Sequence, residues 1–109
     1  MLFFGTSSYS ALEAKDYLKE EGILLDALRL RAFPFSKEVE DFIATHERIF
    51  VIEQNRDAQM RSILINELEI PPHKLIKVLN YDGLPVTAKN IQSQIADYVL
   101  NHSNVLNSL

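Results

Sequence analysis

Hydrophobic residues gather in short runs along the chain, and these runs alternate with stretches in which apolar side chains recur at helical spacing. The short runs are rich in branched and aromatic residues and predict β-strands at residues 2–5, 23–32, 49–53 and 75–79. The amphipathic stretches predict helices at about residues 9–21 and 57–68, with a short helix after Ser36 and a last one after Thr87. This alternation predicts the α/β class, with a mainly parallel sheet, helices on both faces and right-handed crossovers.

The composition of individual runs predicts where each strand lies in the sheet. The third run, Ile49-Phe50-Val51-Ile52, has no polar position, which is typical of a strand that is covered on both faces. In the second run Arg29 and Arg31 alternate with apolar residues, which indicates a strand near the sheet edge. Gly22 is placed to end the first helix, and the hydroxyls of Ser36 and Thr87 are placed to cap the second and the fourth.

The length of 109 residues is enough for one domain with a single core. The first strand opens at residue 2 with no polar lead-in, which we interpret as the start of a fragment of a longer chain. We therefore expect one domain at residues 1–100, followed by a frayed polar tail at residues 101–109.

The charge and the absence of cysteine exclude several classes of function. A net charge of −4 and a pI near 5.3 argue against electrostatic binding to nucleic acid or to an anionic membrane. No apolar run reaches the roughly 18 residues that a membrane-spanning helix needs. Without cysteine the chain has neither disulfides nor thiolate metal sites, and we expect a cytoplasmic protein.

Polar residues follow two of the predicted strands directly. Glu53, Gln54 and Asn55 come after the third run, and Thr6 and Ser7 lie in the glycine turn after the first. If the first and third strands are neighbours, their carboxyl ends bring these residues to one switch-point crevice. The Glu53 carboxylate can then accept hydrogen bonds from a ligand or brace the first turn of a nearby helix, and bracing is the favoured interpretation.

No complete catalytic or phosphate-binding motif accompanies this rim. The turn at Gly5 lacks the further glycines of a dinucleotide fingerprint and the lysine of a nucleotide P-loop, so a capped turn is the simpler interpretation. His46, His73 and His102 have no metal-ligand spacing, and we interpret them as surface residues. The residues alone therefore predict no catalytic residue and no metal ligand.

Several segments occur in an order that is known from one enzyme family. They are Gly5-Thr6-Ser7-Ser8 ahead of Ala11-Leu12-Glu13-Ala14, then Gly22, residues 28–35 with their Pro-Phe turn, Val51-Ile52-Glu53-Gln54-Asn55, and Asp82-Gly83-Leu84-Pro85. This order resembles the C-terminal domain of the alpha subunit of the 2-oxoacid:ferredoxin oxidoreductases, a domain similar to the transketolase C-terminal domain. One departure is Ala58-Gln59-Met60, where the family usually has Gly-Gln-Leu.

The resemblance implies a three-layer α/β/α domain of about four strands in the order 2-1-3-4. It implies an enzyme that oxidatively decarboxylates a 2-oxoacid, transfers the acyl group to coenzyme A and passes electrons to ferredoxin. Thiamine diphosphate, an iron–sulfur cluster and coenzyme A would serve the full enzyme, with none of them bound by this domain. The partners would be the other alpha-chain domains, the beta subunit and ferredoxin, and Glu53, Asn55 and Gln59 would help hold the rim against neighbouring domains.

Two alternatives remain open from the sequence. The same architecture occurs as the C-terminal domain of other thiamine diphosphate enzymes, such as transketolase or the beta subunit of a 2-oxoacid dehydrogenase. The second alternative is a small binding module that holds a phosphate or nucleotide at the switch point. In isolation, an exposed docking face would also favour self-association.

Overall fold

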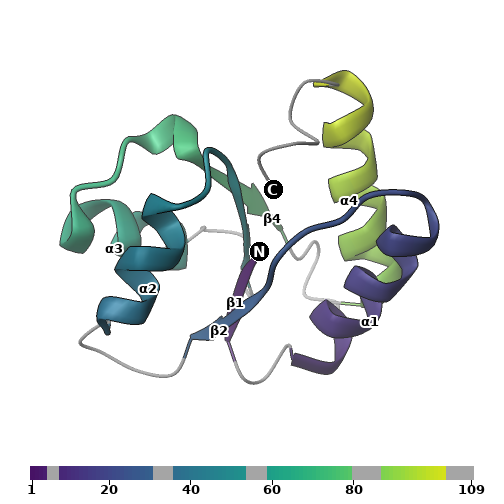
Figure 1. Ribbon diagram of the computed structural model, residues 1–109, viewed down its shortest axis with the longest axis horizontal. Helices are drawn as coiled ribbons and strands as arrows, with labels where there is room; N and C mark the ends of the chain where they lie inside the picture. Colours follow the sequence, from purple (N-terminus) through teal and green to yellow (C-terminus); the bar gives the residue numbers. More distant parts are fainter. Residues whose placement is uncertain (5–7, 31–35, 54–58, 80–86, 103–109) are drawn as a thin grey trace.

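A computed structural model of the chain describes residues 1–4, 8–30, 36–53, 59–79 and 87–102. Its strands and helices alternate along the chain as the hydrophobic pattern predicts (Figure 1). The strands are β1 (Leu2–Phe4), β2 (Leu28–Leu30), β3 (Ile49–Ile52) and β4 (Leu75–Val78). The helices are α1 (Ser8–Glu20), α2 (Lys37–Ala44), α3 (Gln59–Leu68), the short 3-10 helix η2 (Pro72–Lys74) and α4 (Ala88–Asn101).

The four strands form one sheet in the order β2-β1-β3-β4, and every pair is parallel. Leu2 pairs with Leu28 on one side and with Val51 on the other, so β1 and β3 are neighbours. The chain therefore turns outward in opposite directions on either side of this pair, which is the switch point of a doubly wound sheet. The predicted strand order and the predicted edge position of β2 are both confirmed.

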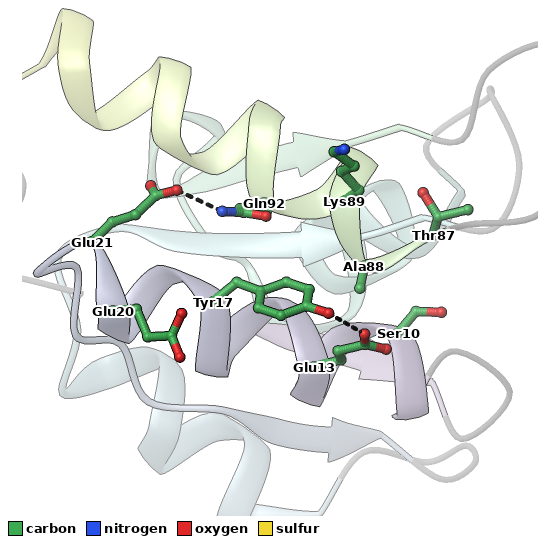
Figure 2. Close-up of a pocket in the computed structure, with 9 residues that line it drawn as sticks. All are labelled: Ser10, Glu13, Tyr17, Glu20, Glu21, Thr87, Ala88, Lys89 and Gln92. Atoms are coloured by element: carbon green, nitrogen blue, oxygen red, sulfur yellow. Dashed lines mark hydrogen bonds between the residues drawn. The ribbon is translucent and has the colours of Figure 1, made fainter.

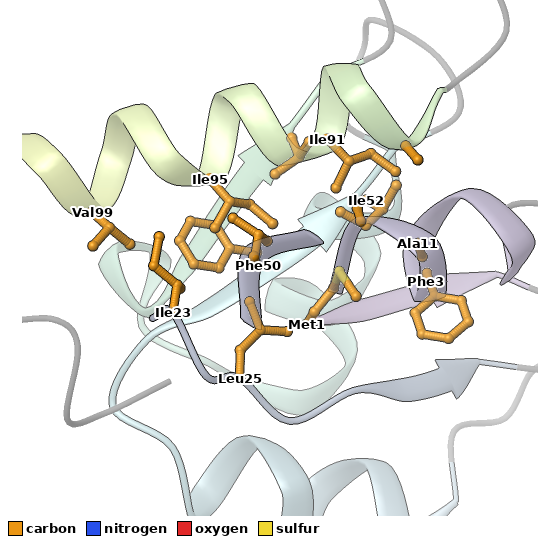
Figure 3. Packing of buried hydrophobic residues seen from close by; sticks show 14 residues of the cluster. Met1, Phe3, Ala11, Ile23, Leu25, Phe50, Ile52, Ile91, Ile95 and Val99 are labelled. Carbon is orange, nitrogen blue, oxygen red and sulfur yellow. The ribbon is translucent and has the colours of Figure 1, made fainter. Parts of the chain in front are cut away.

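The helices cover both faces of the sheet and give the domain three layers. In Figure 1, α1 and α4 lie on one side of the strands, and α2 and α3 lie on the other. Side chains of β3 alternate between two hydrophobic clusters, because successive residues of a strand point to opposite faces. Phe50 and Ile52 join the cluster under α1 and α4 (Figure 3), whereas Ile49 and Val51 join the one under α2 and α3.

Two of the three predicted helix caps form as expected. Thr87 accepts a hydrogen bond from the backbone N–H of Asn90 at 3.1 Å, and Gly22 follows α1 with a φ of +83°. Ser36 occupies the N-cap position of α2, but its side chain makes no capping bond. Its carbonyl oxygen instead accepts from the backbone N–H of Val39 at 3.1 Å, so the prediction of a hydroxyl cap was wrong there.

The second strand is shorter at its start than the hydrophobic run predicted. Pairing with β1 begins where Leu2 meets Leu28, so residues 23–27 precede the ladder. Ile23 and Leu25 are nevertheless buried in the cluster beneath α1 and α4, which explains why the sequence there looks like a strand. The apolar character of Ile23 and Leu25 correctly predicted burial, but the pattern could not distinguish a strand from an irregular buried segment.

We expected a polar tail at residues 101–109, but Asn101 is the last residue of α4 and His102 is its C-cap. Residues 103–109 of the predicted tail lie outside the described residues. The same holds for Asp82, Gly83 and the Pro-Phe turn. Among the helices that the structure describes, none is both long and apolar enough to cross a membrane.

Candidate functional site at the carboxyl edge of the sheet

The predicted rim lies where β1 and β3 end, and part of it is described. Glu53 follows β3 directly, and Gln59 is the first residue of α3. The other rim candidates lie outside the described residues: Thr6, Ser7, Gln54 and Asn55. The geometry of the candidate site is therefore the geometry around Glu53.

Glu53 belongs to the sheet through its backbone and to α3 through its side chain. Its N–H donates to the carbonyl oxygen of Val78 at 2.9 Å, which extends the pairing of β3 with β4 by one residue. The residue is only 2% exposed. Oε1 accepts from the backbone N–H of Met60 at 3.0 Å, and Oε2 accepts from that of Arg61 at 2.7 Å.

These two bonds explain why a carboxylate is stable in this buried position. The first backbone N–H groups of a helix have no partner within the helix and carry partial positive charge. Met60 and Arg61 are the second and third residues of α3, so the Glu53 carboxylate satisfies two of these donors from outside the helix. Of the two roles that the sequence left open for Glu53, the observed contacts are those of a brace.

The environment of Glu53 changes its acidity in a defined direction. Burial raises the pKa of the Glu53 carboxyl above its usual value, because the charged form loses hydration. The hydrogen bonds from Arg61 and Met60 and the charge of Arg61 oppose this shift without cancelling it. A raised pKa is often a mark of an acid–base catalyst. Here, however, both oxygens already hold backbone donors.

Arg61 carries the bracing onward to the next strand, a role that the sequence analysis did not identify. Its Nε donates to the carbonyl oxygen of Leu75 at 2.7 Å, and its Nη2 donates to that of Pro72 at 2.8 Å. Leu75 opens β4 and Pro72 opens η2. The Arg61 side chain thus joins the first turn of α3 to the segment that leads into β4. The backbone N–H of Arg61 joins the same turn to Glu53.

A second polar brace lies at the carboxyl end of β4. Gln94 of α4 presents its side-chain amide to the backbone of Leu79, accepting from the N–H at 3.0 Å and donating to the carbonyl oxygen at 2.8 Å. Its Nε2 also donates to Oδ1 of Asn90 at 2.6 Å. The Gln94 side-chain amide therefore makes the two hydrogen bonds with Leu79 that the backbone of a neighbouring strand would otherwise make. The only sequence signal was a polar residue beside the buried Ile95.

His46 is more than the surface residue that we expected. Its side chain is 12% exposed, and its ring stacks on that of Phe42 with centroids 4.4 Å apart. Nδ1 lies 2.7 Å from the Phe42 carbonyl oxygen, and Nε2 lies 2.8 Å from Oδ2 of Asp26. These contacts join the end of α2 to the segment before β2. His73 and His102 are exposed, as expected.

The described residues contain no cluster of histidine, aspartate or glutamate side chains that could hold a metal ion. Within the described residues, the hydrogen bonds of Glu53, Arg61 and Gln94 join β3 and β4 to the helices beside them. Comparisons of the chain with protein-family models, with curated proteins and with solved structures find no match.

Proposed function

We propose that this chain is the C-terminal domain of the alpha subunit of a 2-oxoacid:ferredoxin oxidoreductase, and that its role there is to form an interface. The order of the sequence segments supports the family. The strand order β2-β1-β3-β4 agrees with the architecture that this family implies. Sequence order and strand order are separate lines of support, although the strand order is shared with other doubly wound domains.

The observation that carries the non-catalytic role is the commitment of Glu53 to α3. A group that transfers a proton needs an oxygen within hydrogen-bond reach of the substrate. Both Glu53 oxygens are instead held by backbone donors, in a residue that is 2% exposed. The carboxylate builds the rim, and its surroundings are suited to keeping that rim in one shape.

A rigid rim is suited to docking, because a surface that is already ordered loses little conformational entropy on binding. Arg61 and Gln94 contribute to the same rigidity at either end of β4. In the proposed enzyme this edge meets the other alpha-chain domains or the beta subunit. Thiamine diphosphate, the iron–sulfur cluster and coenzyme A are then bound by those other parts.

The test is assembly of an alpha subunit that carries this chain with its beta subunit. A variant with Glu53→Ala and Asn55→Ala is compared with Glu38→Ala, which removes an exposed glutamate on α2. We expect the double variant to recover less beta subunit in a pull-down, with ferredoxin reduction falling in proportion. Undisturbed assembly and turnover in the double variant would remove the support for this role.

Calorimetry with coenzyme A and with nucleotides separates the proposal from the small-module alternative. An interface domain gives no binding heat with either ligand. Saturable heat from a nucleotide, abolished in a variant of the switch-point residues Thr6 and Ser7, would favour a ligand-binding module instead. A 2-oxoacid-dependent reaction that needs no ferredoxin would place the chain in another thiamine diphosphate enzyme.

A further inference from the structure

A groove of about 650 Å³ lies between α1 and α4 (Figure 2). These two helices lie on the opposite side of the sheet from α2 and α3 (Figure 1). Its volume falls within the range of about 300–1,000 Å³ that is usual for binding sites. It is separate from the Glu53 brace. The groove residues that carry the argument are Glu13, Tyr17, Glu20, Glu21, Lys89 and Gln92.

The three glutamates of the groove lie along α1 and directly after it. Glu13, Tyr17 and Glu20 are spaced four and three residues apart within α1, which places them on the same side of the helix, and Glu21 is the residue that follows α1. The Tyr17 hydroxyl donates to Oε1 of Glu13 at 2.5 Å, and Nε2 of Gln92 donates to Oε1 of Glu21 at 2.5 Å (Figure 2). Both donors are neutral, so neither hydrogen bond brings a positive charge to a carboxylate.

The net charge of the groove defines what can cover it. The residues that line the groove include three carboxylates, those of Glu13, Glu20 and Glu21, and one ammonium group, that of Lys89. A neutral or anionic surface laid over them would remove their hydration without a compensating charge, which is unfavourable. The occupant must therefore bring positive charge.

An arginine side chain fits this groove better than a lysine. Its planar guanidinium has five donors in a fixed fork, so it can bind a carboxylate through two parallel hydrogen bonds. The same plane can stack on an aromatic face, and the Tyr17 side chain, 38% exposed, supplies one between the carboxylates. The ammonium group of lysine is not planar, so it can neither bind a carboxylate through two parallel hydrogen bonds nor stack on the tyrosine ring.

Exposed apolar residues on the same helix favour a protein segment over a small free cation. Tyr9 is 92% exposed and Leu12 is 47% exposed, and both lie in the first half of α1, which also contributes Glu13. Arginine and aromatic residues are enriched in protein interfaces. A segment that places an arginine in the groove can cover these two side chains with its neighbouring residues.

We infer that the groove between α1 and α4 is a docking site for an arginine side chain carried by a segment of a partner protein. The inference deepens the proposed function, because an interface domain needs a partner. It concerns a surface apart from the carboxyl edge, however. Its test uses this chain alone, so it does not depend on assembly with a beta subunit.

The probe is a capped tripeptide, leucine-arginine-leucine, titrated into the isotope-labelled chain and followed by backbone amide shifts. The control peptide replaces arginine with citrulline, which has nearly the same shape and no charge. We expect saturable shifts at groove residues of α1 and α4 with millimolar affinity for the arginine peptide. The citrulline peptide should cause none, and raising the salt concentration should weaken binding.

A charge-neutralising pair of substitutions tests the residues themselves. Glu20→Gln with Glu21→Gln should weaken binding of the arginine peptide about tenfold. The matched control is Glu38→Gln with Asp41→Asn, which changes the charge equally on the exposed surface of α2 and should leave affinity unchanged. Melting temperatures establish that all variants are folded.

Three results would overturn the inference: equal shifts with citrulline, shifts confined to other surfaces, or full affinity in the Glu20 and Glu21 variant. Groove binding together with failure to assemble with a beta subunit would leave the docking site in place and remove the oxidoreductase proposal. Assembly with a beta subunit but no peptide binding in the groove would support the oxidoreductase proposal and remove the docking site. The two proposals can thus fail separately.

Discussion

The backbone N–H of Arg61 donates a 2.7 Å hydrogen bond to Oε2 of Glu53, eight residues earlier in the chain. The Arg61 guanidinium then donates to the carbonyl oxygen of Leu75, at the start of the next strand. The end of β3, the first turn of α3 and the start of β4 therefore share one polar connection. This connection lies at the edge where doubly wound sheets usually bind ligands.

Removing the Glu53 side chain should destabilise the fold. Glu53→Ala leaves the N–H groups of Met60 and Arg61 without their acceptors, and loss of a helix cap or a charged hydrogen bond costs about 2 kcal/mol. For a domain of this size we expect the melting temperature to fall by roughly 10 °C. Glu53→Gln keeps one acceptor oxygen and should lose less.

Thermal melts monitored by circular dichroism give both values, with Glu38→Ala on the exposed surface of α2 as the control. If Glu53→Ala melts within a degree or two of the parent chain, the carboxylate does not brace α3.

When residues 1–109 are produced alone, with a free amine at Met1, their stability should depend on pH. The Met1 amine donates to the Asp26 carbonyl oxygen at 2.7 Å, and burial lowers its pKa from 8.0 to about 5. Between pH 8 and pH 5 the unfolded chain binds the proton more readily, so stability falls as the pH decreases through this window. The change corresponds to a few kcal/mol, at about 1.4 kcal/mol per pKa unit.

Acetylation of the amino terminus removes this titration and keeps an N–H donor. The difference in unfolding free energy between the free and acetylated chains should therefore change between pH 8 and pH 5 and become constant above pH 8. Glu53 acts in the opposite sense, because a raised carboxyl pKa gives stability that is lost as the pH rises through it. It is common to both chains and cancels in the difference. Parallel curves would show that the amine is hydrated when the chain is folded.

The two glutamines of α4 provide a matched comparison. Gln94 makes two hydrogen bonds to the backbone of Leu79, whereas Gln92 makes an exposed bond to Glu21. We expect Gln94→Ala to cost about 1–3 kcal/mol, because it leaves partly buried backbone groups unpaired, and Gln92→Ala to cost less than about 0.5 kcal/mol. Denaturant unfolding measures both. Equal costs would contradict the bracing role of Gln94.

The Tyr17 hydroxyl should titrate at higher pH than an ordinary tyrosine. Its hydrogen bond to Glu13, together with the charge of that carboxylate, raises the pKa of Tyr17. Glu13→Gln keeps an oxygen acceptor and removes the charge, so the pKa should move back towards its usual value. The Tyr17 ring resonances, followed by NMR through the alkaline range, report the midpoint. An unchanged midpoint in the variant would show that the two side chains do not interact in solution.

The sequence predicted most of the fold because binary patterning and local signals agreed. The fully apolar run at Ile49 to Ile52 became a central strand, and Arg29 marked an edge strand. Gly22 and Thr87 ended and began their helices as expected. Each of these predictions rests on residues that are close together along the chain, so the sequence pattern contains the information that the prediction needs.

The braces could not be predicted in the same way, because they join residues that are distant along the chain. Gln94 and Leu79 are fifteen residues apart, and the Arg61 side chain reaches carbonyl oxygens eleven and fourteen residues away. The spacing of polar and apolar residues does not predict which side chain forms a hydrogen bond with a distant backbone carbonyl oxygen. Glu53 is different, because a carboxylate directly after a buried strand predicts a polar residue at the sheet rim, and its hydrogen bonds to Met60 and Arg61 are those of the favoured brace.

The central claim is that Glu53 supports the rim of an interface domain and does not take part in chemistry. The most direct test is the rate of 2-oxoacid- and coenzyme A-dependent ferredoxin reduction by the proposed enzyme with Glu53→Gln in its alpha chain. We predict an unchanged rate per assembled complex, together with a lower melting temperature or weaker assembly. A fall of about a hundredfold or more in that rate, with melting and assembly unchanged, would contradict the claim and identify Glu53 as a catalytic group.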